Sequence, residues 1–241
     1  MDELTFHTRL HRPGSILDVG AHDGLLALPL SRLAGATLLA FEPLPSAFAR
    51  LEAAIRAEYG TIPSHIALHP TALGAAPGWL TLSVPVLDGV AQEQWASTAK
   101  TYAGFASVTV VRHAVPVTTI DALGLRDLQH VKLDAEGFEA EVLSGARATL
   151  AACRPVLSLE VEERHRPGST RDVPALLAGL GYETWFVLDG AWHPIADFDA
   201  ATMQAASPDP AVFTASDPYV FTFFAWPGER SAEIRAALTL G

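Results

Sequence analysis

Carboxylate side chains stand at the ends of several short apolar runs in this sequence. Asp18 lies near the end of the run SILDV, Glu42 directly follows TLLAF, and Asp134 directly follows HVKL. Apolar runs of this length are typical of buried β-strands. An ionised carboxylate accepts hydrogen bonds from hydroxyl and ammonium groups, and it can take up a proton. The three residues are therefore candidates for binding a polar ligand and for acid–base chemistry.

The turn after the first run contains two glycines four residues apart, Gly20 and Gly24, in the segment ILDVGAHDG. Glycine permits a tight turn and a close approach of the backbone to a ligand. The spacing is G-x-x-x-G, which differs from the G-x-G-x-x-G pattern of dinucleotide-binding folds. Asp18 and Asp23 place negative charge around the turn. This charge favours a cationic or zwitterionic ligand over a pyrophosphate.

Glu42 lies 24 residues after Asp18, at the expected end of the next strand. A carboxylate in this position can accept hydrogen bonds from both hydroxyls of a ribose. Each acidic residue taken alone is equally compatible with a solvated loop. Because the two residues end consecutive strands, we expect a nucleoside site between them.

A second acidic segment, VKLDAEGFE, places Asp134 and Glu136 where a strand ends and a helix is about to begin. Both side chains should then face the same crevice as the glycine turn. Carboxylates are also favourable beside the exposed N–H groups of a helix N-terminus, which explains Glu136 better than Asp134. Farther along, Glu160 and Glu162 leave the next strand on the same side. They are either substrate contacts or a solvated strand end.

The elements that must position these residues alternate between strand and helix. We expect strands at residues 15–19, 37–41, 65–68, 130–133, 156–161, 184–188 and 219–225, and helices at 24–33, 46–59, 139–151 and 173–180. This alternation predicts right-handed parallel βαβ units in a doubly wound α/β sheet, with ligands at the C-terminal ends of its strands. A β-rich insertion interrupts the pattern, with strand signals at 79–84, 107–111 and 115–118.

Two stretches without periodicity, residues 88–104 and 197–217, are expected to form loops. Long loops in compact domains often carry function. Substrate specificity should therefore lie in 88–104, in the Pro-rich stretch 194–218 and at the ends of the later strands. The chain has 241 residues, of which 49% are hydrophobic and 18% charged. These values predict a single globular domain over residues 1–241, with a core at about 15–190 and a last strand at about 219–225.

A net charge of −11 argues against a duplex nucleic-acid binder, which needs a basic surface. The single cysteine, Cys153, permits no disulfide within the chain and no cysteine-based zinc site, and it suits a cytoplasmic location. The charged first residues and the lack of a long apolar run give no sign of a signal peptide or a membrane span. His7 and His11 lie in an N-terminal stretch without a helical pattern, so we expect no ligand pair there. The oligomeric state stays unknown.

The sequence resembles the FkbM-type methyltransferases, which depend on S-adenosylmethionine. The resemblance runs from about residue 15 to 165 and rests on five segments: ILDVGAHDG (16–24), AFEPLPSAF (40–48), VTTIDAL (117–123), VKLDAEGFEAEVLSGARATL (131–150) and PVLSLEVEE (155–163). It implies a Rossmann-like, mostly parallel, seven-stranded sheet. It also implies transfer of a methyl group to a hydroxyl oxygen of a small molecule or sugar, such as a secondary metabolite or a glycan.

The resemblance further implies roles for residues at matching positions. The glycine turn would line the methionine part of the cofactor, Glu42 would hold the ribose beside Pro43, and the segment after the third strand would lie near the adenine; the full set is Asp18, Gly20, Ala21, His22, Asp23, Glu42, Pro43, Thr71, Ala72 and Leu73. Asp134 and Glu136 would border the methyl group or the acceptor. His22 departs from the asparagine that is more common in the family, but a histidine can still donate a hydrogen bond to a carboxylate.

An alcohol is a weak nucleophile, so its proton must be removed during methyl transfer. Asp134 is the candidate base, with Glu136 orienting the acceptor. In an alternative, the two carboxylates hold Mg²⁺, which lowers the pKa of the alcohol. We favour the metal-free version because the sequence does not supply a full ligand shell. Two other functions stay open: a nicotinamide-dependent oxidoreductase, which the glycine spacing disfavours, and a non-catalytic module that binds the cofactor.

Overall fold

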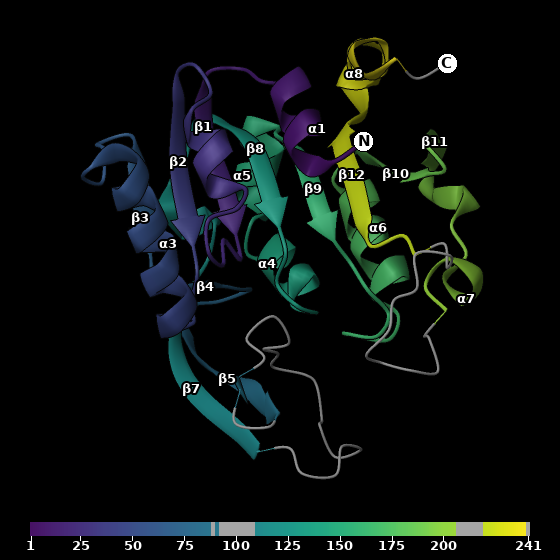
Figure 1. Cartoon of the computed structure of the whole chain (residues 1–241). Helices are drawn as coiled ribbons and strands as arrows, with labels where there is room; N and C mark the ends of the chain where they lie inside the picture. The colour runs from purple at the N-terminus through teal and green to yellow at the C-terminus, as the bar shows by residue number, and fades with distance from the viewer. Residues whose placement is uncertain (88–89, 92–108, 206–218, 240–241) are drawn as a thin grey trace.

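A mixed eight-stranded sheet forms the centre of the molecule, in the strand order β11-β10-β12-β9-β8-β1-β2-β3 (Figure 1). The computed structural model describes residues 1–87, 90–91, 109–205 and 219–239. The strands are β1 Gly14–Val19, β2 Ala36–Phe41, β3 Ile66–His69, β8 Leu128–Leu133, β9 Val156–Glu160, β10 Tyr182–Leu188, β11 Ala191–Pro194 and β12 Thr222–Pro227. From β3 to β9 all neighbours pair in parallel, whereas β12 and β11 run antiparallel to their neighbours. The prediction of a mostly parallel α/β sheet is confirmed.

The prediction of seven strands is wrong, because β10 continues into β11 as a hairpin. The two strands are joined by Asp189 and Gly190 alone, with φ angles of 50° and 79°. Left-handed φ values at both central residues are the mark of a type I′ turn, which an Asp-Gly pair favours between antiparallel strands. The eighth strand therefore had a local signal in the sequence, the dipeptide that follows Leu188.

Helices cover both faces of the sheet. Successive side chains of a strand point to opposite faces, and the central strands have buried apolar residues on both, so each face needs a cover. Leu17, Val131 and Leu157 are partners in register across β1, β8 and β9, and they belong to one core cluster. Helices α4 Glu139–Ser144, α5 Arg147–Cys153 and α6 Ser169–Gly179 pack on this side. Helices α1 Glu3–Arg9, α2 Ala27–Ser31, α3 Pro45–Tyr59 and α8 Ser231–Leu238 cover the opposite face.

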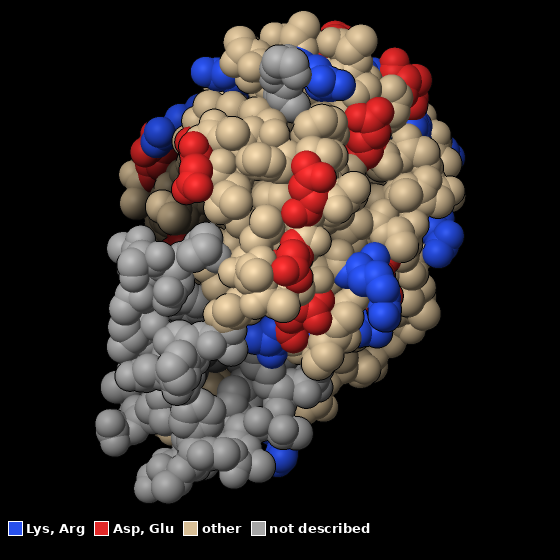
Figure 2. All heavy atoms as spheres, turned by 90° about the vertical axis from the view of Figure 1, so that its right-hand side faces the viewer, with Lys and Arg blue, Asp and Glu red and all other residues tan. Residues whose placement is uncertain are grey.

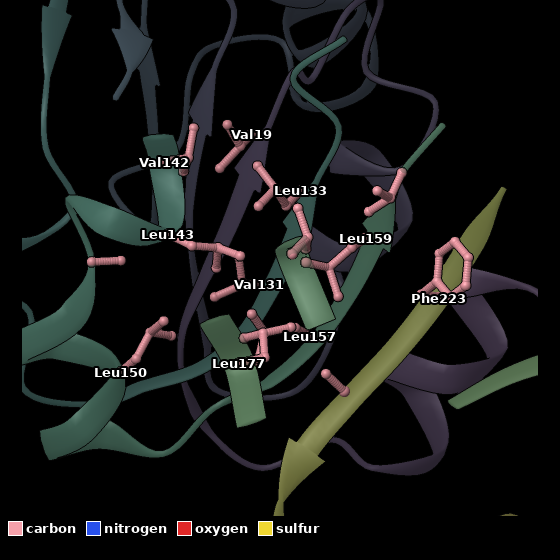
Figure 3. Packing of buried hydrophobic residues seen from close by; sticks show 14 of the residues in the cluster. Val19, Val131, Leu133, Val142, Leu143, Leu150, Leu157, Leu159, Leu177 and Phe223 are labelled. Carbon is pink, nitrogen blue, oxygen red and sulfur yellow. The ribbon is translucent and has the colours of Figure 1, made fainter. Parts of the chain in front are cut away.

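The cluster under α4, α5 and α6 is the largest part of the core. Figure 3 shows side chains of the strands and of these helices meeting there, among them Val19, Val131, Leu133, Val142, Leu143, Leu150, Leu157, Leu159, Leu177 and Phe223. Full burial of such a side chain stabilises the fold by roughly 1.5–3 kcal/mol. The cluster includes residues at the ends of β1, β8 and β9, so it holds these strand ends in place. The acidic residues near the strand ends are held in place with them.

A second sheet of four strands lies beyond the carboxyl ends of the parallel strands (Figure 1). Its order is β4-β7-β5-β6, with β4 Ala72–Leu73, β5 Gly78–Leu87, β6 Val90–Ala91 and β7 Thr109–Thr118. The two runs predicted at 107–111 and 115–118 belong to the one strand β7 over its described residues. Most of the predicted loop 88–104, and residues 206–217 of the second predicted loop (197–217), lie outside the described residues. The described part of the second loop contains a short helix at Ala200–Met203, whose first turn is capped by the side chain of Asp199.

Several helices differ from their predicted bounds. The predicted helix 139–151 is divided into α4 and α5, and the predicted helix 24–33 is limited to α2, where Pro29 occupies the first turn that tolerates it. The first residues form α1, although their sequence shows no helical pattern. The remaining short elements are α7 Ala200–Met203 and the 3-10 turns Asp121–Leu123, Ile195–Asp197 and Gly228–Arg230.

Charged groups of both signs are mixed on the face seen from the side of β11 and α7. Figure 2 shows acidic and basic side chains next to one another there, with uncharged residues between them. Among the described residues, no helix has the length and the apolar character that crossing a membrane requires.

Gly145, which ends α4, holds the second sheet close to the main body. A Cβ atom added to Gly145 would lie 2.0 Å from the carbonyl oxygen of Gly74, the residue after β4. We predict that Gly145→Ala lowers the free energy of unfolding by about 1–3 kcal/mol, because the backbone must move apart. In the matched variant Gly179→Ala, the added Cβ atom has no other atom within 4 Å. The free energy of unfolding should therefore stay unchanged or rise slightly. Urea unfolding measures both; equal midpoints for the two variants would contradict the close contact.

Candidate functional site

A cavity of about 480 Å³ opens at the carboxyl ends of β2, β1, β8 and β9. Leu80 and Leu82 of β5 and Phe138 contribute an apolar wall opposite the polar strand ends. All the residues predicted for the site line this one cavity: Asp18, Gly20, Ala21, His22, Asp23, Glu42, Pro43, Thr71, Ala72, Leu73, Asp134 and Glu136. The structure thus gives them a common location, and their roles in binding and catalysis stay predictions.

The glycine turn brings the ends of β1 and β8 into backbone contact. Gly20 has a φ of 74°, and a Cβ atom there would lie 2.0 Å from the carbonyl oxygen of Asp134. Only glycine fits this position, on both conformational and steric grounds. The N–H groups of Gly20 and Ala21 both donate to the carbonyl oxygen of Phe41, at 2.9 and 3.0 Å. The floor of the cavity is therefore a rigid backbone junction of three strands.

The carboxylate of Glu42 joins the loops that follow β1 and β2. Its Oε2 accepts the backbone N–H of His22 at 2.9 Å, and its Oε1 accepts that of Leu44 at 2.8 Å. Burial raises the pKa of Glu42, and these two N–H groups act in the opposite direction. Each oxygen keeps further acceptor capacity. The two hydroxyls of a ribose could donate to these oxygens.

The backbone conformation of His22 explains why a histidine fits at this position. Its φ is 49°, a left-handed value that asparagine, aspartate and histidine tolerate better than most residues with a Cβ atom. This conformation accompanies the backbone donation of His22 to Glu42. A histidine can thus replace the expected asparagine for a conformational reason. The donation to Glu42 comes from the backbone N–H, and the ring Nδ1 lies 3.6 Å from Oδ1 of Asp23.

Asp18 is fully buried, and neither of its carboxylate oxygens has a hydrogen-bond partner within the described residues. The Nζ atom of Lys132 lies 3.6 Å from Oδ1, an ion-pair distance that is too long for a hydrogen bond. Burial raises the pKa of Asp18, and the charge of Lys132 lowers it. Buried polar oxygens are normally satisfied, so two open acceptors at a cavity wall point to a donor supplied by a ligand.

Lys132 lines the cavity at its centre of charge, and sequence reasoning did not name it. Its ammonium donates to the carbonyl oxygen of Gly20 at 2.7 Å and lies 3.6 Å from Asp134 Oδ2 as well as from Asp18. Burial opposes its charge, but the carboxylates of Asp134, Asp18, Glu3 and Glu160 raise its pKa above the ordinary lysine value. Strand alternation was the available signal, because residues 132 and 134 of VKLDAE point the same way.

Asp134 and Glu136 are held by different partners. Asp134 pairs with Lys132, whereas Oε2 of Glu136 lies 3.3 Å from Nε2 of His165. The turn between them is built by the buried Glu139, whose Oε1 accepts the N–H groups of residues 135 and 137. Burial raises the pKa of Glu139 to about 7. Over the part of the chain that is described, no three His, Cys, Asp or Glu side chains are grouped to hold a metal ion.

Glu160 and Glu162 both line the cavity. Burial, together with the charges of Asp134 and Glu3, raises the pKa of Glu160 to about 8. Glu162 is only 4% exposed and accepts hydrogen bonds from Tyr219 and Arg164, so a solvated strand end is the wrong interpretation for it. Arg164 and Glu3 also line the cavity, and sequence reasoning named neither of them.

Comparison with solved structures supports the same fold. A methyltransferase FkbM from Methylobacillus flagellatus KT matches with a TM-score of 0.58 and 16% identity, over 92% of this chain and 46% of that one. The O-methyltransferase TomG from Streptomyces achromogenes, solved in complex with S-adenosylmethionine, matches with a TM-score of 0.50 and 12% identity, over 93% of this chain and 78% of that one. This chain thus spans about half the length of the first structure.

Among curated proteins, none matches this sequence closely enough to count as a relative. The family model for the methyltransferase FkbM domain matches residues 18–184, a range that begins at Asp18 and includes Glu42, Lys132 and Asp134. Because this range is more than half of the chain, the protein belongs to the family of FkbM methyltransferase domains.

Proposed function

We propose that this chain transfers a methyl group from S-adenosylmethionine to a hydroxyl oxygen of a small molecule or sugar. The observation that carries the proposal is the pair of buried carboxylates, Asp18 and Glu42, at the ends of adjacent strands and on one cavity wall. Asp18 has two unsatisfied oxygens for a cationic donor, and Glu42 has acceptor capacity for ribose hydroxyls. Both needs are met by a nucleoside that carries positive charge.

The charge of the cavity agrees with such a ligand. Four carboxylates, of Asp134, Asp18, Glu3 and Glu160, act on the single ammonium of Lys132. Acidic groups therefore outnumber the one basic group at this position. S-adenosylmethionine supplies an electrophilic methyl group on a sulfonium cation when bound. Thr71, Ala72 and Leu73 offer a less polar surface on the side of the cavity near Glu42, where we place the adenine.

Residues at the β8 end supply the acid–base chemistry in this proposal. Asp134 lines the cavity beside Lys132, and a carboxylate there is placed to act as a general base. Asp134 can therefore take the proton of the acceptor hydroxyl while the oxygen bonds to the methyl carbon and the carbon–sulfur bond breaks. Glu136, on the same turn, orients the acceptor. Glu160 is protonated at neutral pH, so it can donate a hydrogen bond to the acceptor instead of repelling it.

The structural comparison suggests where to look for the acceptor. The name of TomG describes an O-methyltransferase, and at 12% identity the likeness concerns the fold alone. It is nevertheless a reason to test hydroxyl acceptors before amines or carbon acids. Leu80, Leu82 and Phe138 give the cavity an apolar wall, so acceptors that combine a hydroxyl with an apolar or ring face come first.

The cofactor proposal predicts the binding of two ligands. Calorimetry should detect both S-adenosylmethionine and S-adenosylhomocysteine, and Glu42→Ala and Asp18→Ala should each lower affinity at least about tenfold through lost charge-assisted hydrogen bonds. Glu52→Gln, on the exposed side of α3 where Glu52 pairs with Arg56, is the control and should bind normally. Wild-type affinity in both cavity variants would refute the site, and binding of NAD(H) or NADP(H) instead would favour an oxidoreductase.

The base assignment predicts a separation of turnover from binding. Asp134→Asn should lower the rate of S-adenosylhomocysteine formation about 10²–10⁴-fold, the usual range for losing general-base catalysis, with cofactor affinity little changed. The measurement uses a panel of hydroxylated acceptors with and without EDTA. If EDTA inactivates the protein and Mg²⁺ restores activity, the metal-free mechanism is wrong and the Mg²⁺ alternative takes its place. Binding without turnover across the panel, in the wild type as well, would indicate a non-catalytic module.

The environment of Glu160 predicts a pH-dependent stability. Its pKa is about 8 in the folded chain against an ordinary value of 4.5, so between these values the folded state holds a proton that the unfolded chain has released. This contribution to stability is therefore lost as the pH rises through the window. Urea unfolding at about pH 5 and about pH 9 should show Glu160→Gln gaining stability relative to wild type at the higher pH. An equal difference at both pH values would contradict the raised pKa.

A further inference from the structure

A hydrogen-bonded chain of buried side chains leads from the cavity into the face covered by α1. The Oγ atom of Ser158 lies 2.6 Å from Oε1 of Glu3 and 3.0 Å from Nε2 of His7. Nδ1 of His7 in turn lies 3.2 Å from Nδ1 of His130. Glu3 lines the cavity, so the chain has one end in the site and three members behind it. Glu3 has so far entered only through its charge beside Lys132, and the other three residues have no part in the chemistry described above.

The far end of this chain sets the direction of every hydrogen bond. The backbone N–H of Arg12 lies 3.4 Å from Nε2 of His130, and a backbone N–H can only donate. Burial lowers the pKa of His130 to about 3 and that of His7 well below its ordinary value, so both rings are neutral. His130 therefore carries its proton on Nδ1 and donates to His7, and His7 donates to Ser158. The hydroxyl of Ser158 is left to donate to Glu3.

This direction makes Glu3 an acceptor with a fixed orientation. Burial raises the pKa of Glu3, whereas donation from Ser158 and the charge of Lys132 lower it. One carboxylate oxygen is engaged by Ser158, and the group as a whole lines the cavity. Anchoring α1 to the sheet would not by itself need an ionisable group, since Phe6 of the same helix is fully buried against the core. The carboxylate therefore calls for a further partner.

Strand register and one hydrogen bond put Glu3 and Asp18 at the two ends of one row of side chains. Asp18, Lys132 and Ser158 are partners across β1, β8 and β9, so their side chains form one row on the face that α1 covers. Glu3 contacts the Ser158 end of this row, and the charge of Asp18 reaches it strongly enough to contribute to raising its pKa. Asp18 at the other end has two buried oxygens without a hydrogen-bond partner among the described residues. Two acidic groups thus face the space above Lys132.

We propose that Glu3 is a cofactor-binding residue that, together with Asp18, accepts hydrogen bonds from the ammonium group at the methionine end of S-adenosylmethionine. Ser158, His7 and His130 are positioning residues for Glu3. The inference rests on the proposed function, which places the ribose on Glu42. With the ribose at the end of β2, the residues that would hold the methionine end lie next along the sheet, at Asp18 on β1 and Lys132 on β8. An ammonium has three donors, and Asp18 and Glu3 supply acceptors for them.

Calorimetry with two nucleosides tests this inference. S-adenosylhomocysteine carries the amino-acid end, whereas 5′-methylthioadenosine keeps the nucleoside and the thioether and lacks that end. Glu3→Gln should weaken S-adenosylhomocysteine about tenfold and leave 5′-methylthioadenosine within about twofold, because only the first ligand donates to Glu3. Ser158→Ala keeps the carboxylate but frees its orientation, so it should give a smaller loss of about threefold with the same selectivity. Glu52→Gln is again the control.

Each outcome decides the matter. A purely structural role for Glu3 predicts equal losses for both ligands, and either equal losses or none in Glu3→Gln would overturn the inference while leaving the proposed function intact. If the wild type binds neither nucleoside, the proposed function fails and this inference fails with it. Thermal unfolding is recorded for each variant. If Glu3→Gln does not fold, the selectivity of Ser158→Ala decides, since that variant removes one hydroxyl and leaves Glu3 in place.

Discussion

The attraction between the ammonium of Lys132 and the carboxylates around it is the interaction on which the rest of the site depends. Four carboxylates approach one buried region, and without a cation among them they would repel one another and resist ionisation. Lys132 lies 3.6 Å from both Asp18 and Asp134 and is held in place by the carbonyl oxygen of Gly20. A buried charge is tolerable only when it is paired and hydrogen-bonded, and this one is both.

The position of Lys132 also explains why the acidic groups differ from one another. Asp134 is its ion-pair partner, and its side chain is partly exposed in the cavity. The charge of Lys132 also lowers the pKa of Glu160, but burial and the acidic neighbours outweigh that effect and raise this pKa to about 8. The two carboxyl groups thus differ in their surroundings although both lie near the same cation.

Much of the fold and of the polar cavity wall could be predicted because both depend on local patterns. Apolar runs followed by glycine or an acidic residue predicted β1, β2 and β8 and placed Asp18, Glu42 and Asp134 at their ends. Where a prediction failed, either a local sequence signal was overlooked or a contact between distant segments outweighed the local pattern. The Asp-Gly turn that creates β11 was overlooked, and the single helix predicted at 139–151 was overruled because Gly145 must pass close to Gly74.

The parts that escaped prediction depend on register between strands that are far apart in the sequence. Nothing near Ser158 indicates that it stands beside Lys132 and in line with Asp18, since that row exists only once three strands are paired. Glu3 joins the row from a helix whose sequence shows no amphipathic pattern, because its place is set by Phe6 in the core and by His7 on Ser158. A short segment can therefore contribute to a site through one packed ring and one hydrogen-bonded chain. Residues of this kind become visible only when side chains are followed across the sheet instead of along the sequence.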